Sequence, residues 1–134
     1  MGLPEVILLD THVVIWLLGN PERLSKGAAR LIRKARAETG VAICSVTLFE
    51  IAQLTIRGRI GIAGLLSDFL GEIATRFVLR DINPRIAFQS AQFNDPYPRD
   101  PFDRLIGATA VVEGMALITA DEMIRNSGQV QTVW

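Results

Sequence analysis

The chain has 134 residues, the size of a single domain, and a domain of this length buries about two-thirds of the surface that its unfolded chain exposes. Fourteen basic and fourteen acidic residues cancel, which excludes an overall positive field for nucleic acid and leaves only local patches. Hydrophobic residues make up 49% of the sequence, so we expect some apolar surface to contact a partner. Cys44 is the only cysteine, which excludes an intramolecular disulfide and suits a reducing compartment.

The beginning of the sequence has no features of a targeting signal. No basic segment precedes the apolar run over residues 6–18, and Asp10, Thr11 and His12 interrupt that run. Such a pattern fits neither a secretory signal peptide nor a membrane span. We therefore expect one cytoplasmic domain over residues 1–134, without membrane association.

The first half of the chain alternates short apolar runs with segments of helical periodicity. The sequence predicts a strand over 6–9, a buried helix over 12–18, a surface helix over 25–39, a strand over 41–44 and a helix over 45–57. The surface helix has a basic outer face formed by Arg30, Arg33, Lys34 and Arg36. We interpret this face as a solvated exterior, with a nucleic-acid patch as the alternative.

The second half of the chain continues the alternation. The sequence predicts a helix over 65–75, a strand over 77–79, a helix over 84–93, a loop over 94–98, a helix over 101–114, a strand over 116–119, a short helix over 121–126 and a strand over 130–133. Alternating short apolar strands and amphipathic helices are typical of a three-layer α/β/α fold with a central parallel sheet.

Four carboxylates fall where this fold would bring them together. Asp10 and Asp121 follow predicted strands, Glu50 lies one turn into the helix after the second strand, and Asp103 is in the first turn of helix 101–114. Because the carboxyl ends of parallel strands share one edge of the sheet, we expect the four acids to converge there. Asp100 lies in the same helical turn and is the alternative to Asp103.

Converging carboxylates repel one another and raise one another's pKa, so such a cluster calls for a cation. Ligands made only of oxygen suit Mg²⁺ or Mn²⁺, and the shortage of histidine and cysteine argues against zinc. A divalent ion of this kind lowers the pKa of bound water and polarises a phosphoryl oxygen. Phosphodiester hydrolysis is therefore the reaction that the pattern favours.

Each acid also has a simpler interpretation as a helix cap. Asp10, Asp100 and Asp121 stand at positions that N-cap a following helix, and Thr47 with Glu50 matches the capping box S/T-x-x-E. Taken singly, capping alone explains each acid as well as metal binding does. The joint position at one sheet edge is what favours a site.

Several neighbours of the acids are candidates for supporting roles. We expect the hydroxyls of Thr11, Ser45 and Thr119 to orient the carboxylates or metal-bound water. Arg104 and Arg99 are candidate phosphate contacts, although pairing of Arg104 with a carboxylate is slightly favoured.

The single histidine and a nearby tryptophan receive structural interpretations. His12 stands in an apolar helix two residues after Asp10, so we expect its ring to point away from the acids. Trp16 lies on the same helix and is expected to be part of the core.

Four segments together resemble the PIN-domain nucleases, particularly VapC-like toxins of toxin–antitoxin pairs: residues 8–12 (LLDTH), 45–52 (SVTLFEIA), 99–110 (RDPFDRLIGATA) and 117–121 (LITAD). The segments occur in the family's order and span nearly the whole chain. The resemblance implies a Mg²⁺-dependent endoribonuclease, with Mn²⁺ able to substitute, whose acidic cluster is Asp10, Glu50, Asp103 and Asp121. It also implies an RNA substrate, a cognate antitoxin and a homodimer.

Two other classes of protein compete with this interpretation. A Mg²⁺-binding receiver-type signalling domain needs adjacent acids after the first strand and a late lysine, but a single acid follows residue 9 and no lysine occurs after Lys34. A PIN-like module that binds RNA or a partner without cutting is the second alternative, and the presence of all four acids counts against it.

Overall fold

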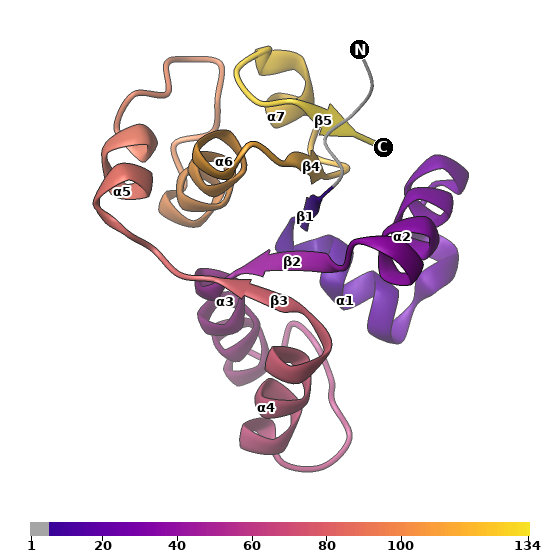
Figure 1. The fold of residues 1–134 in the computed structure, drawn as a ribbon. Helices are drawn as coiled ribbons and strands as arrows, with labels where there is room; N and C mark the ends of the chain where they lie inside the picture. The colour runs from indigo at the N-terminus through magenta and orange to yellow at the C-terminus, as the bar shows by residue number, and fades with distance from the viewer. Residues whose placement is uncertain (1–5) are drawn as a thin grey trace.

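The computed structural model describes residues 6–134, and the strands and helices of this range alternate along the chain. The elements are β1 (Ile7–Leu9), α1 (Thr11–Gly19), the 3₁₀ turn η1 (Pro21–Arg23), α2 (Lys26–Glu38), β2 (Val41–Cys44), α3 (Ser45–Ile56), α4 (Leu66–Arg76), β3 (Val78–Arg80), α5 (Pro84–Ser90), α6 (Pro101–Glu113), β4 (Ala116–Ile118), α7 (Glu122–Ser127) and β5 (Thr132–Val133). The five strands form one parallel sheet in the order β3-β2-β1-β4-β5 (Figure 1).

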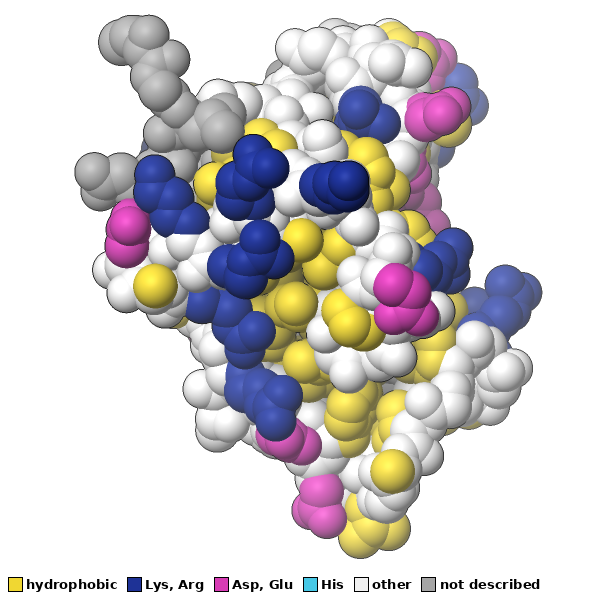
Figure 2. All heavy atoms as spheres, turned by 90° about the vertical axis from the view of Figure 1, so that its right-hand side faces the viewer, with side chains coloured by type: hydrophobic (Ala, Val, Ile, Leu, Met, Phe, Trp, Pro, Cys, Tyr) yellow, Lys and Arg dark blue, Asp and Glu magenta, His cyan; other side chains and the backbone are white. Residues whose placement is uncertain are grey.

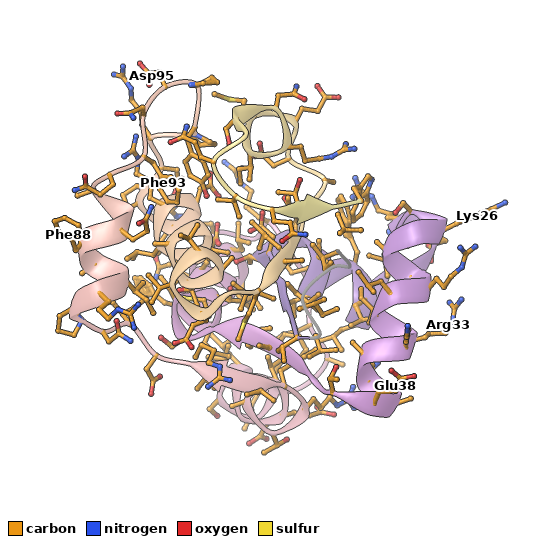
Figure 3. All side chains as sticks on the ribbon, turned by 45° about the horizontal axis from the view of Figure 1, so that its top comes forward. Lys26, Arg33, Glu38, Phe88, Phe93 and Asp95 are labelled. Atoms are coloured by element: carbon orange, nitrogen blue, oxygen red, sulfur yellow. The ribbon has the colours of Figure 1, made fainter. Side chains whose placement is uncertain are left out.

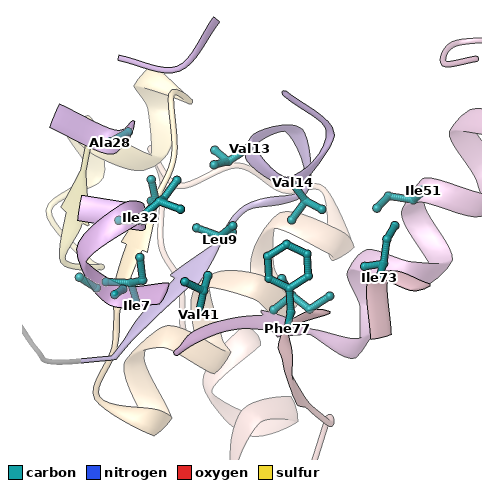
Figure 4. Close-up of a cluster of buried hydrophobic side chains, with 14 residues drawn as sticks. Ile7, Leu9, Val13, Val14, Ala28, Ile32, Val41, Ile51, Ile73 and Phe77 are labelled. Carbon is teal, nitrogen blue, oxygen red and sulfur yellow. The ribbon is translucent and has the colours of Figure 1, made fainter. Parts of the chain in front are cut away.

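Helices cover both faces of the sheet, which confirms the predicted three-layer α/β/α architecture. Successive strand residues point to opposite faces, so Ile7 and Leu9 join one buried cluster while Leu8 joins the other. Helices α1, α2, α3 and α4 pack over the first cluster, part of which is shown in Figure 4. Helices α5, α6 and α7 pack over the second. Burial on both faces explains why the inner strands are uninterrupted apolar runs in the sequence.

The chain changes direction across the sheet between β1 and β4. These strands are paired neighbours, with Leu9 opposite Ile118. The chain leaves β1 into α1 on one face and leaves β4 into α7 on the other face. In an open parallel sheet, this divergence creates a crevice at the carboxyl ends of the two strands, where ligands bind.

The predicted elements all exist, but several of their ends differ. The helix predicted over 84–93 ends at Ser90, because tight turns follow in which Ala91 and Gln92 donate hydrogen bonds three residues back. The last strand pairs only at Thr132–Val133, a shorter segment than 130–133. Residues 1–5, the start of the segment examined for a targeting signal, lie outside the described residues. Within residues 6–134, no helix combines the length and apolar character needed to cross a membrane.

Close packing of a loop against α6 positions the start of that helix. Tyr97 is buried and stacks on Phe93 with ring centroids 4.0 Å apart. Its hydroxyl donates a hydrogen bond of 2.6 Å to the backbone carbonyl of Asp103. Gly107 allows this approach, because a Cβ there would overlap the Tyr97 hydroxyl and come within 2.8 Å of its Cζ.

We predict that Gly107→Ala lowers the free energy of unfolding by about 1–3 kcal/mol, because the added methyl group overpacks the contact with Tyr97. The matched control is Gly71→Ala within α4, where a Cβ meets nothing within 4 Å. The control is expected to raise stability by up to about 1 kcal/mol through helix propensity. Urea unfolding of both variants checks the prediction, and an equal effect of the two substitutions would contradict it.

Candidate active site

Asp10 lies at the carboxyl end of β1 and is fixed by hydrogen bonds to both carboxylate oxygens. The residue is only 3% exposed. Oδ1 accepts from the backbone N–H of Thr11 at 2.8 Å, and Oδ2 accepts from the Thr119 hydroxyl at 2.8 Å. Burial raises the pKa of Asp10 and Asp121 raises it further, while the nearby imidazole of His12 and the two hydrogen bonds oppose this. Asp10 therefore caps α1 and remains oriented within the crevice.

His12 contacts the site, so the expectation that its ring points away is wrong. Its Nε2 accepts a hydrogen bond of 3.0 Å from the backbone N–H of Ala120. An accepting Nε2 carries no proton, which places the ring proton on Nδ1. Nδ1 lies 3.7 Å from Asp10 Oδ2. The imidazole therefore joins α1 to the turn after β4 and faces Asp10.

Asp121 lies across the crevice from Asp10 and is linked to it through Thr119. Its Oδ1 accepts from the backbone N–H of Ile124 at 3.0 Å and so caps α7. Its own backbone N–H donates to the Thr119 hydroxyl at 3.1 Å. Because that hydroxyl also donates to Asp10, one buried threonine connects the two acids that follow the paired strands β1 and β4.

Glu50 extends from α3 and has no capping role. The N-cap of α3 is Cys44, with no side-chain cap, and Thr47 lies inside the helix with its hydroxyl 3.0 Å from that of Thr11. The capping-box interpretation is therefore wrong. Glu50 Oε1 is buried without a hydrogen-bond partner among the described residues. Burial raises the pKa of Glu50, Asp10 and Asp100 add to this effect, and the Thr11 hydroxyl opposes it.

Asp103 experiences the combined negative charge of the cluster. It is half-buried in the first turn of α6, and its backbone carbonyl is held by Tyr97. Burial, followed by the charges of the other acids, raises the pKa of Asp103 to about 8. By contrast, Asp100 is exposed and its Oδ1 accepts from the backbone N–H of Phe102 at 2.8 Å, as an N-cap. The geometry therefore favours Asp103 over Asp100 as the third acid.

The donor chemistry of the cluster fits a hard divalent cation. All the donors are carboxylate or hydroxyl oxygens, Glu50 Oε1 lacks a partner, and the acids raise one another's pKa as they would without a neutralising charge. Within residues 6–134, however, no three carboxylate, imidazole or thiol groups are close enough together to form a ready-made metal site. The acids share one edge of the sheet and interact electrostatically, but their side chains do not surround a common point.

Three other predicted site residues have different surroundings. The Ser45 hydroxyl, at the first residue of α3, forms no hydrogen bond with the described part of the chain. Arg104 donates to the backbone carbonyls of Pro98, Ser90 and Phe93 at 3.0, 3.3 and 3.0 Å.

These bonds correct the expectation that Arg104 pairs with a carboxylate, and they favour a role in anchoring the loop before α6 over contact with phosphate. Arg99 is exposed and forms an ion pair of 3.1 Å with Asp95.

Comparisons with known proteins identify the family of the chain. The sequence matches the PIN domain family over residues 7–128. The chain belongs to the PIN-domain family. A relative, Ribonuclease VapC22 of Mycobacterium tuberculosis, is 34% identical over 130 residues, which cover 96% of this chain and 98% of the relative.

Solved PIN-like structures share the fold. VapBC2 from Rickettsia felis bound to a promoter DNA fragment gives a TM-score of 0.70 at 13% identity, with 96% of this chain and 97% of the other covered. VapBC-1 from nontypeable Haemophilus influenzae also gives 0.70, at 16% identity and 96% coverage of both chains. At these identities the likeness establishes the fold alone.

Sequence reasoning missed two contributors to this site, Tyr97 and the inward-facing ring of His12, and it assigned Thr47 to helix capping. Thr47 contacts Thr11 across 36 residues, and no local pattern reports such a pairing. Tyr97 stands in a proline-rich loop whose only signal was an isolated aromatic residue.

We predict that Asp103 makes the metal-free protein less stable as the pH rises. Its pKa is about 8 in the folded chain and about 4 in the unfolded chain. The folded state therefore holds this proton more tightly, so the stabilisation is complete below about pH 4 and is lost as the pH rises through about 8.

Urea unfolding in chelator between about pH 5 and pH 8 should show a steeper loss for the wild-type chain than for Asp103→Asn. Asp68→Asn, on the exposed surface of α4, is the control. If the free energy of unfolding fell equally with pH in the wild-type chain and in Asp103→Asn, the raised pKa of Asp103 would be contradicted.

Proposed function

We propose that the chain is a metal-dependent endoribonuclease that hydrolyses RNA phosphodiester bonds, and that it is the toxin of a toxin–antitoxin pair. The observation that carries the proposal is the group of four acids at the crevice between β1 and β4, in a chain 34% identical to a protein named as a ribonuclease. Several proteins of the same fold are VapBC proteins, and another is a toxin–antitoxin complex from Klebsiella pneumoniae. The cytoplasm is the proposed location.

The proposed metal ligands are Asp10, Glu50, Asp103 and Asp121, with Mg²⁺ as the cofactor and Mn²⁺ as a substitute. A divalent cation, when bound, would supply an activated water and neutralise charge on the phosphate oxygens. The chain's own residues supply orientation. Thr119 and the backbone of Thr11 fix the Asp10 carboxylate, and Glu50 contributes an oxygen that no protein group occupies.

An apolar pocket supports a protein partner. The pocket has a volume of about 240 Å³ and lies between α1, α3, α4 and the segment before α4. Its lining includes Val14, Leu18, Ile51 and Phe69. We propose that an apolar segment of the antitoxin occupies this pocket, because none of the residues that line it is charged.

Self-association has support on another face. Phe88 on α5 is 68% exposed, and Ile82 just before α5 and Val111 on the neighbouring helix α6 are also exposed. Figure 3 shows Phe88 at the edge of the molecule, pointing away from the sheet. We propose that this face forms the homodimer contact, since exposed apolar patches mark interaction surfaces.

Family membership excludes the receiver-type alternative, and the non-cutting PIN-like module remains the competing function.

We predict that Asp10→Asn lowers the rate of RNA cleavage by at least about 100-fold, because loss of a metal ligand costs at least as much as loss of the groups that support one. The substitution removes the charge and keeps the shape, so circular dichroism and melting temperature should report an intact fold. Asp68→Asn is the control and should cleave at the wild-type rate. Equal cleavage by the wild-type chain and Asp10→Asn would overturn the site.

A second prediction concerns metal binding itself. A cation that binds only the folded state adds about 2.7 kcal/mol of stability at 100 times its dissociation constant. Mg²⁺ or Mn²⁺ should therefore raise the melting temperature of the antitoxin-free chain. The double variant Asp10→Asn, Asp103→Asn should show a much smaller rise. An identical rise in both proteins would place the ion elsewhere.

A further inference from the structure

A row of basic side chains covers the outer face of α2. Figure 2 shows Lys and Arg side chains gathered in a column on the side of the molecule that carries this helix, and Figure 3 shows Lys26 and Arg33 pointing outward from it. The basic stripe consists of Arg23 at the end of η1 together with Lys26, Arg30, Arg33, Lys34 and Arg36 on α2, all of them exposed. Within residues 6–134, none of the six forms an ion pair.

The spacing of the basic side chains along the stripe suits contact with a chain of phosphate groups. Its members from Lys26 to Arg33 follow one another at three or four residues, which sets neighbouring side chains about 5–6 Å apart on the helix. Six of the fourteen basic residues of a neutral chain lie between positions 23 and 36, where no acidic residue occurs. A concentration of unpaired positive charge is complementary to a phosphate backbone.

A pocket with aromatic walls begins at one end of this stripe. It has a volume of about 340 Å³ and is lined by His12, Ile15, Trp16, Gly19, Asn20 and Arg23, together with two residues of the segment after α3. The Arg23 guanidinium lies 4.3 Å from the centroid of the Trp16 ring. Stacked guanidinium and indole groups form a surface of the kind on which nucleic-acid bases stack.

The same pocket adjoins the acidic cluster through His12. His12 lines it with a ring that is 4.9 Å from Trp16, while its Nδ1 lies 3.7 Å from Asp10 Oδ2. Trp134 also contacts Trp16, at 5.8 Å between ring centroids, and its backbone lies against Gly27 at the start of α2. Acid, aromatic pocket and basic stripe are therefore continuous across α1 and the beginning of α2.

We propose that the pocket formed by His12, Trp16 and Arg23 takes one base of a single-stranded RNA, and that the basic stripe on α2 holds the phosphates beyond it. The proposal rests on the proposed function and adds the path of the substrate strand. It replaces the interpretation of the α2 face as a solvated exterior. The aromatic pocket distinguishes RNA from an acidic peptide, which would use the stripe without a stacking surface.

Binding to the Asp10→Asn chain tests the stripe without requiring cleavage. The probe is a fluorescein-labelled single-stranded RNA of about 12 nucleotides, followed by anisotropy over a series of salt concentrations. Each phosphate contact contributes about 0.7 to the slope of log affinity against log salt for single strands. Arg33→Gln in this background should lower the slope by about 0.7 and weaken binding about fivefold at 0.1 M salt.

The matched control is Arg85→Gln, an exposed arginine on α5, which Figure 1 shows on the opposite side of the sheet from α2. This control removes the same charge and should leave both affinity and slope unchanged. Equal affinity and equal salt slope in the two variants would overturn the proposal that the stripe binds RNA.

Abasic positions in the RNA test the pocket. One abasic position should weaken binding by about fivefold or more, since stacking of one base contributes that much. In the Trp16→Leu background the same abasic position should not change the affinity. In the Trp16→Phe background it should weaken binding nearly as much as in the Asp10→Asn chain. A purely structural role of Trp16 would lower the melting temperature of Trp16→Leu but leave the abasic effect intact, and that result would overturn the proposal.

The two proposals fail separately. If the wild-type chain cleaves no RNA but Arg33→Gln and the abasic position weaken binding as stated, the proposed function fails and the RNA path stands. If the wild-type chain cleaves RNA and neither change affects binding, the path fails and the proposed function stands.

Discussion

The hydrogen bond from the Thr119 hydroxyl to Asp10 Oδ2 joins the carboxyl ends of the paired strands β1 and β4. After these two strands, the chain continues on opposite faces of the sheet. The partners of this hydrogen bond are 109 residues apart, so the bond forms only when β1 and β4 are side by side. The same hydroxyl accepts from the backbone of Asp121, and His12 spans the same crevice from α1 to Ala120. This pair of strands also sets the positions of Glu50 and Asp103, because α3 and α6, which carry them, begin at the same edge of the sheet.

The fold concentrates negative charge where burial makes charge costly. Burial is the largest cause of the raised pKa of Asp10, Glu50 and Asp103, and the neighbouring acids add to it in all three. A chain selected for stability alone would not bury carboxylates in this way. The arrangement supports the proposed cation site, with the hydrophobic clusters on both faces providing the stability that buried carboxylates lack.

The sequence was sufficient for the architecture and for placing the four acids at one edge of the sheet, because both follow from local patterns. Continuous apolar runs such as residues 41–44 predict strands buried on both faces, and the position of Asp10 after such a run places it at the sheet edge. Contacts across long stretches of chain could not be predicted in this way. The Thr11–Thr47 contact, the inward ring of His12 and the three carbonyls held by Arg104 depend on how layers pack, which one-dimensional periodicity does not encode.

The central claim is that these acids together hold one or more divalent cations at the carboxyl edge of the sheet. A crystal structure of the wild-type chain grown with Mn²⁺ tests it most directly, through the anomalous scattering of the ion. The account predicts an anomalous peak about 2.1 Å from an oxygen of Asp10, with oxygens of at least two of Glu50, Asp103 and Asp121 coordinating the same ion or a second one beside it. Manganese bound only away from Asp10, or none at saturating concentration, would contradict it.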